Sequence, residues 1–144
     1  MPTARKFFNK EEQQLLFDAI TTAELKTSGE IRLHLENICF GNEIKSAEKI
    51  FLKLKMHHTK ERNGVLIYIA TLSKKIAIVG DEGIHQKLGD QFWQSIINKL
   101  TQQFKENKKA KALAEVIIEC GEQLGKFFPR SSDDKNELSN TISF

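Results

Sequence analysis

The sequence predicts an α/β fold, a three-layer α/β/α sandwich in which helices flank a small mixed central sheet. Residues 65–70 are six consecutive apolar residues, which is typical of a central strand covered on both faces. Segments before and after this strand repeat apolar residues at helical spacing, so each is expected to bury one face. The chain has 144 residues, enough for one domain with a buried core.

The first half of the chain predicts a helix, a strand and a second helix. Asn9 is expected to cap the first helix, and Glu12 is placed to complete a capping box. Residues 27–29, Thr-Ser-Gly, end this helix. Residues 31–36 alternate apolar and polar side chains, which predicts a half-buried strand. After a break at residues 41–42, the expected inner face of the second helix consists of Ile44, Ala47, Ile50, Phe51 and Leu54.

The central strand is expected to form a hairpin with residues 75–79, turning near residues 72–74. The acidic turn Gly80-Asp81-Glu82-Gly83 follows directly. Apolar residues at helical spacing then predict a third helix near 92–104 and a fourth near 113–124.

One domain is expected over residues 1–129, because Pro129 ends the last helix. Residues 130–144 are polar and are expected to form a flexible tail. That tail ends in Ile142-Ser143-Phe144, which could dock on the domain.

Composition favours an ordinary globular protein and argues against a nucleic-acid-binding protein and against a membrane-inserted one. The net charge is only +3 and the lysines are dispersed, so no nucleic-acid partner is expected. Residues 1–10 lack an apolar run and no segment is long enough to span a bilayer, so we expect a cytoplasmic protein without membrane insertion. Cys39 and Cys120 form no CxxC motif and are expected to be buried reduced thiols.

The expected topology brings polar residues to one rim of the sheet. The first two strands should be parallel and the third antiparallel, so the end of the third strand lies beside the starts of the other two. Asp81 and Glu82 would then meet Glu30 and Asn63, with Asp90 in a bordering loop. Carboxylate and amide oxygens suit Ca²⁺, and also Mg²⁺.

A plainer interpretation of the same residues stays open, in which polar loops cap the sheet and face water. Asp81 and Asp90 could each serve as a helix N-cap. The spacing is also not that of an EF-hand loop.

The residues of the hairpin also resemble a known family. Arg62-Asn63-Gly64-Val65-Leu66-Ile67, then Ala77-Ile78-Val79-Gly80-Asp81-Glu82-Gly83-Ile84, then Phe92-Trp93, resemble the TPM domain family. The resemblance runs from about residue 10 to Pro129, and the hairpin with its acidic turn is the specific portion. It implies an α/β/α sandwich that binds divalent cations, Ca²⁺ in particular, at this rim. Some plant members are acid phosphatases, and others modulate membrane protein complexes.

Two positions depart from the family pattern. Secreted relatives usually have aspartate where Asn63 stands and glutamate near His85, and both departures reduce the negative charge. They weaken the case for a phosphatase more than the case for a cation site. Asp90 matches an acidic position of the family. Asp81 matches the residue found in family members without a membrane anchor.

Three functions follow as hypotheses. The first is a non-catalytic, regulatory Ca²⁺/Mg²⁺-binding domain that uses the five rim residues. The second is a metal-assisted acid phosphatase with Asp81 or Asp90 as nucleophile or general base. The third is a module that binds a peptide or a membrane protein, for which the apolar end of the tail is the pointer.

Overall fold

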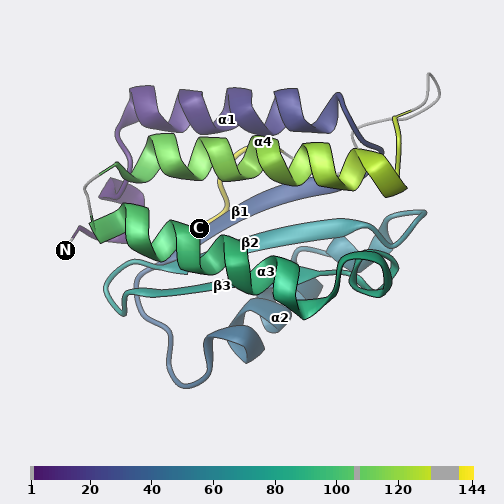
Figure 1. The fold of residues 1–144 in the computed structure, drawn as a ribbon. Helices are drawn as coiled ribbons and strands as arrows, with labels where there is room; N and C mark the ends of the chain where they lie inside the picture. Colours follow the sequence, from purple (N-terminus) through teal and green to yellow (C-terminus); the bar gives the residue numbers. More distant parts are fainter. Residues whose placement is uncertain (1, 106–107, 131–139) are drawn as a thin grey trace.

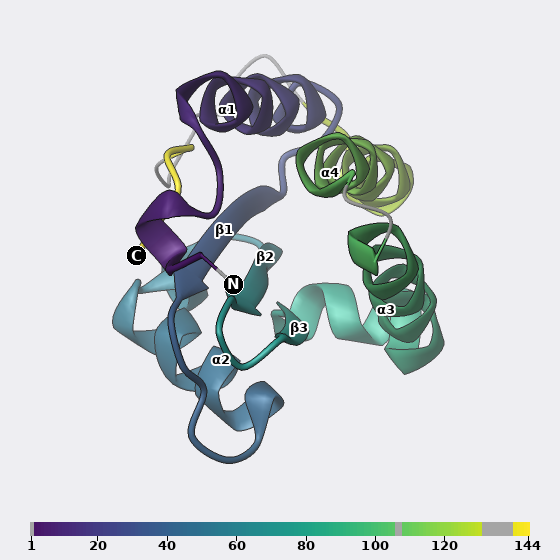
Figure 2. The same cartoon turned by 90° about the vertical axis from the view of Figure 1, so that its left-hand side faces the viewer.

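The computed structural model describes residues 2–105, 108–130 and 140–144 (Figure 1). The elements are η1 (Ala4–Lys6), α1 (Lys10–Glu24), β1 (Glu30–Glu36), α2 (Glu43–Lys53), η2 (Met56–His58), β2 (Gly64–Ala70), β3 (Lys75–Gly80), α3 (Glu82–Lys105) and α4 (Lys109–Phe127). Helices α1, α3 and α4 curve over one face of the sheet, and α2 covers the other (Figure 2). The predicted α/β/α architecture is confirmed.

The sheet has the order β1-β2-β3, with β1 parallel to β2 and β2 antiparallel to β3. Glu30 pairs with Gly64 at the start of the two parallel strands, and Val65 pairs with Gly80 at the end of β3. These three strand ends therefore lie at one rim of the sheet, as the sequence predicts.

Two separate cores hold the layers together, because alternate residues of each strand point to opposite faces. On the face of α1, α3 and α4, the sheet contributes Ile31, Leu33, Leu35, Val65, Ile67, Ile69 and Ile78. On the face of α2, it contributes Leu66, Tyr68, Ala70 and Ala77. Every residue of β2 is buried, which explains the unbroken apolar run at 65–70.

The helix boundaries agree with the sequence at α1 and differ at α3. Asn9 Oδ1 accepts a hydrogen bond from Glu12 N (2.8 Å) and Glu12 Oε1 accepts one from Asn9 N (2.9 Å), so the predicted capping box is confirmed. Helix α3 begins at Glu82, about ten residues before its expected start. The backbone of Gly89 has φ +74°, and this kink joins a first short turn to the long helix that the apolar spacing predicts.

Two expectations about buried faces were wrong. His34 on β1 is only 4 % exposed, because Tyr68 stacks on its ring at 6.0 Å between centroids and the C-terminal segment runs along the open edge of β1. Ile44, expected on the inner face of α2, is 53 % exposed. It lies in the first turn of a helix that contacts mainly β3.

The C-terminal residues do dock on the domain. Ser143 N donates to Leu33 O and Ser143 O accepts from Leu35 N, both at 2.9 Å, while Phe144 lies 4.8 Å below the guanidinium of Arg5. The expected flexibility of the tail concerns mostly residues 131–139, which lie outside the described residues.

Candidate functional site

Asp81 is the structural centre of the rim. It follows β3 directly and is 6 % exposed. Its N–H donates to Gly64 O (2.9 Å), and its carbonyl oxygen accepts from Ile84 N and His85 N at 3.0 Å. Its carboxylate Oδ1 accepts from Glu82 N (2.8 Å). Asp81 therefore caps α3, as the plainer interpretation of the sequence anticipated.

Arg62 holds both carboxylates of the acidic turn. Its Nε donates to Asp81 Oδ2 (2.8 Å) and its Nη2 to Asp81 Oδ1 (2.9 Å), which is a two-pronged pair. Its Nη1 donates to Glu82 Oε1 (3.1 Å). The hydrogen bonds to Asp81 raise the pKa of Arg62 above its usual value, so this guanidinium remains a fixed positive charge. Its side chain is 42 % exposed, so it reaches the rim from the solvent side.

A second polar cluster lies beside Arg62 on the same loop. Asn63 is 1 % exposed, and its Nδ2 donates to Ser28 Oγ and to Glu61 Oε2, both at 3.1 Å. The Ser28 hydroxyl donates to the same Glu61 oxygen (2.5 Å). A Cβ on Gly83 would lie 2.6 Å from the Glu61 carbonyl oxygen, so this loop contacts the first turn of α3 directly. Glu61 thus adds a third carboxylate to the rim.

Glu30 starts β1 at the rim, but its side chain is 1 % exposed and lies beside Glu24 of α1. Its N–H donates to Asn63 O (3.3 Å), and the next N–H, from Ile31, donates to Glu24 Oε2 (2.9 Å). Burial and then the neighbouring charge of Glu30 raise the pKa of Glu24 to about 8, against the hydrogen bond from Ile31. The structure thus brings Glu30 next to a second buried carboxyl group.

Asp90 lies on α3 just after the kink, and its side chain is 90 % exposed. Its Oδ1 is 3.6 Å from His85 Nε2. Both residues line an open cavity of about 430 Å³ that also contacts Trp93 and Gly80. Asp90 therefore lies within α3 and not in a loop, and its nearest charged neighbour is His85 of the same helix.

The structure thus brings Asp81 and Glu82 together around Arg62. Asn63 lies in the adjacent cluster with Ser28 and Glu61. Glu30 lies beside Glu24, and Asp90 beside His85. Within residues 2–105, 108–130 and 140–144, no three histidine, cysteine, aspartate or glutamate side chains lie close enough to hold one metal ion. Sequence reasoning missed the role of Arg62. The available signal was the position of this arginine directly before Asn63-Gly64, in the turn that leads into β2, where its φ is +52°.

Comparisons with known proteins agree with this fold. Residues 3–123 match the TPM domain. The chain is similar to the BA42 protein of the psychrophilic bacterium Bizionia argentinensis, whose structure was solved by NMR. The two are 42 % identical over 99 % of each chain, with a TM-score of 0.89. The comparison with curated proteins gives no match. Of the described helices, none is both long and apolar enough to cross a membrane.

Proposed function

Since this chain belongs to the TPM domain family, we propose that it is a regulatory domain that binds Ca²⁺, and more weakly Mg²⁺, at the rim in place of the Arg62 guanidinium. One observation carries the proposal. Arg62 is a tethered cation held by Asp81 and Glu82, with Glu61 one residue away. The rim is therefore built to hold positive charge, and the arginine is only one of the cations that suit it.

The available oxygens favour a hard cation with irregular coordination. If the guanidinium swings into solvent, it frees Asp81 Oδ2 and Glu82 Oε1, while Asp81 Oδ1 keeps the hydrogen bond from Glu82 N. Glu61 and Asn63 flank Arg62 in the sequence. Ca²⁺ accepts six to eight oxygen ligands in flexible geometry and retains water, whereas Mg²⁺ requires near-ideal octahedral geometry. Loop carboxylates of this kind suit Ca²⁺ better.

The arginine also sets the strength of binding. Because Ca²⁺ can enter only when Arg62 has moved away, the apparent affinity falls by the fraction of molecules in the open state. Arg62 is 42 % exposed, so its release exposes little buried surface. We therefore expect dissociation constants in the millimolar to micromolar range, in the weaker part of the range known for protein calcium sites.

Of the five expected ligands, the proposal depends most on Asp81, Glu82 and Asn63. Glu30 is buried beside Glu24, and Asp90 faces solvent beside His85. Asp90→Asn is therefore a control, since it changes one rim-bordering charge and should alter calcium affinity by less than about threefold.

The test is a ¹⁵N–¹H titration of the chelator-treated protein with Ca²⁺. We expect saturable shifts at 61–64 and 80–84. Asp81→Asn should abolish them, and Arg62→Gln should tighten binding by about tenfold. Arg62→Gln should also lower the melting temperature without Ca²⁺ and increase the stabilisation that Ca²⁺ provides. Shifts that stay the same in Asp81→Asn, or that weaken in a folded Arg62→Gln, would show that the rim is not the site.

The two alternatives differ in their support. Both Asp81 oxygens accept hydrogen bonds, so no contact favours this residue as the nucleophile of a phosphatase. An interaction module is favoured by one observation, the pairing of Ser143 with the open edge of β1, because an added strand is a common way to bind peptides. Deleting residues 140–144 should speed amide exchange at Leu35 and leave calcium affinity unchanged.

A further inference from the structure

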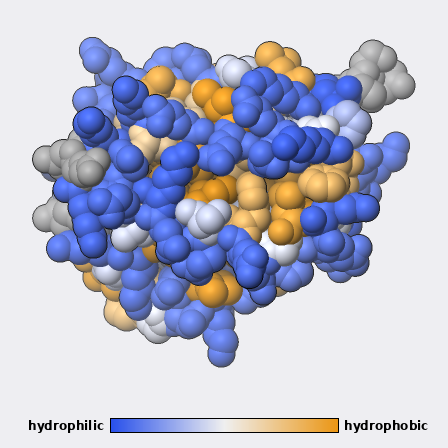
Figure 3. Space-filling model, viewed as in Figure 1, coloured by the Kyte–Doolittle hydropathy of each residue, from blue (hydrophilic) through white to orange (hydrophobic). Residues whose placement is uncertain are grey.

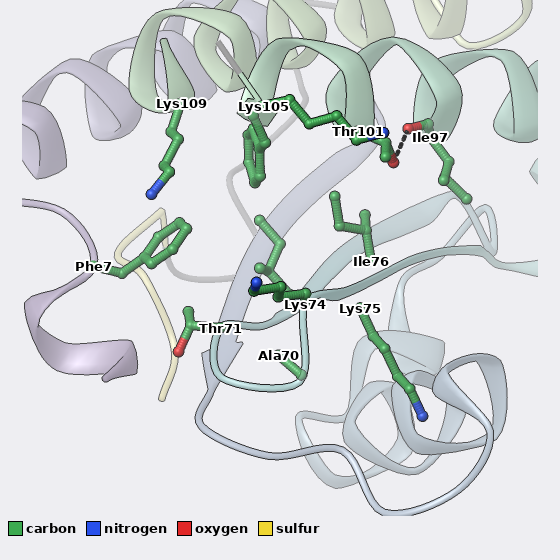
Figure 4. Close-up of a pocket in the computed structure, with 12 residues that line it drawn as sticks. Phe7, Ala70, Thr71, Lys74, Lys75, Ile76, Ile97, Thr101, Lys105 and Lys109 are labelled. Carbon is green, nitrogen blue, oxygen red and sulfur yellow. Dashed lines mark hydrogen bonds between the residues drawn. The ribbon is translucent and has the colours of Figure 1, made fainter. Parts of the chain in front are cut away.

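A second cavity lies at the opposite end of the sheet from the rim. It has a volume of about 340 Å³ and opens between the β2–β3 turn, the last turns of α3 and the segment after η1 (Figure 4). Apolar side chains form its floor and walls, contributed by Phe7, Ile69, Ile76, Ile97 and Phe104. The face of the molecule that carries α3 and α4 is mostly hydrophilic, and its apolar surface gathers near the middle of the face (Figure 3). Because apolar walls are a usual feature of small-molecule sites, this cavity is a candidate for one.

Four lysines line this apolar cavity: Lys74, Lys75, Lys105 and Lys109. The side chain of Lys75 points away from it (Figure 4), so the positive charge at the entrance comes from the other three. None of its lining residues is acidic, and none of the four lysines forms an ion pair within the described residues. Lys75 Nζ donates to Gly41 O (2.7 Å), and Lys109 Nζ lies 4.7 Å from the centre of the Phe7 ring. The cavity thus combines an apolar interior with a positive entrance.

The start of α4 adds to this positive charge. Helix α4 begins at Lys109 beside the entrance, and its first turn contains no acidic residue. Lys108 at the N-cap position makes no side-chain capping hydrogen bond. The N-terminus of this 19-residue helix therefore presents its partial positive charge close to the lysines.

We propose that this cavity binds a free fatty carboxylate of medium chain length. The hydrocarbon chain would lie against Ile69, Ile76 and Phe104, and the carboxylate would lie at the entrance near Lys105 and Lys109. A volume of about 340 Å³ is near the lower end for ligand sites, so one short chain fits better than a two-chain lipid. The site is independent of the calcium rim, and it requires both parts of the ligand, a chain and a negative head.

Chain length and charge provide the first test. In a ¹⁵N–¹H titration with sodium octanoate below its micelle concentration, we expect shifts at 69–76 and 97–105. Each buried methylene contributes about 0.8 kcal/mol, so affinity should rise by about fourfold per methylene from hexanoate until the cavity is full. Heptyltrimethylammonium, which has the same seven-carbon chain and the opposite charge, should bind at least tenfold more weakly. Equal binding of the two, shifts elsewhere, or no shifts would overturn the proposal.

Variants provide the second test. Lys105→Gln combined with Lys109→Gln should weaken octanoate binding by about tenfold, and added salt should reduce this difference. Lys87→Gln, on an exposed position of α3 outside the cavity, is the matched control and should leave affinity unchanged. Thr101 lines the cavity from an exposed position of α3, so Thr101→Trp should fill it and abolish binding. Unchanged affinity in the double lysine variant, or vesicle binding without binding of free octanoate, would refute the assignment.

Discussion

The buried carboxyl group of Glu24, which lies beside Glu30, should make the stability of this protein fall as the pH rises. Glu24 is 4 % exposed, and burial, followed by the charge of Glu30, raises its pKa from 4.5 to about 8. Arg130 Nη1 donates a hydrogen bond to the main-chain oxygen of Glu24 (3.0 Å). We therefore choose Glu24→Gln as the perturbation, because glutamine keeps the shape and the acceptor oxygen of the protonated side chain.

The sign follows from proton linkage. Between pH 4.5 and about 8 the folded protein holds a proton on Glu24 that the unfolded chain has lost, so the free energy of unfolding decreases as the pH rises through this window. The stabilising contribution is complete below pH 4.5 and is lost above about pH 8. The full pKa shift of Glu24 corresponds to about 5 kcal/mol. We therefore expect the free energy of unfolding to fall by about 2–5 kcal/mol across this pH window.

The assay is urea unfolding at pH 5, 7 and 9, followed by the fluorescence of Trp93. Glu24→Gln should match the natural protein at pH 5 and exceed its stability at pH 9 by about 2–5 kcal/mol, since the amide has no charge to bury. Glu115→Gln, an exposed change on α4, is the control and should show the pH dependence of the natural protein. Parallel stability curves for Glu24→Gln and the natural protein would refute the reasoning, as would a loss of stability in Glu24→Gln at pH 9.

Three further predictions concern the helices. Asn9→Ala removes the capping box and should lower the free energy of urea unfolding by about 1 kcal/mol. Gly121→Ala would place a Cβ 2.7 Å from Ala23 Cα, so α1 and α4 must separate and the melting temperature should fall with a cost of about 1–3 kcal/mol. An unchanged melting temperature would show that the helices adjust freely. Burial raises the pKa of Cys120 to about 12, so iodoacetamide at pH 8 should label this thiol only after unfolding, as mass spectrometry would show.

The sequence predicted the layers well because they depend on periodicity. The apolar run at 65–70 required cover on both faces, and the strand–helix–strand order left one simple topology for β1 and β2. Two buried faces were misjudged, the second face of β1 and the place of Ile44 on α2. His34 looks like a solvent-facing residue in the pattern, but Ser143, more than a hundred residues away, closes the strand edge. A contact this distant in the sequence leaves no local signal.

The partners of the charged groups could not be predicted in the same way. The topology brought Asp81, Glu82 and Asn63 to one rim, yet it contained no information on how Arg62 would turn. That depends on a residue with φ +52° and on side-chain rotamers across a tight loop. Glu30 shows the same limit, since its neighbour Glu24 follows from the close approach of α1 to the start of β1. Periodicity therefore locates charged residues, whereas packing chooses their partners.

The two proposed sites should act independently, because they lie at opposite ends of the sheet. Strand β2 has seven residues and so separates the rim at Gly64 from the cavity at Ala70 by about 20 Å. That distance is about twice the screening length of roughly 10 Å at 0.1 M salt. Saturating Ca²⁺ should then leave octanoate affinity unchanged within about twofold. Any larger change must appear equally in the effect of octanoate on calcium affinity, and it would mean that the fold couples the two sites.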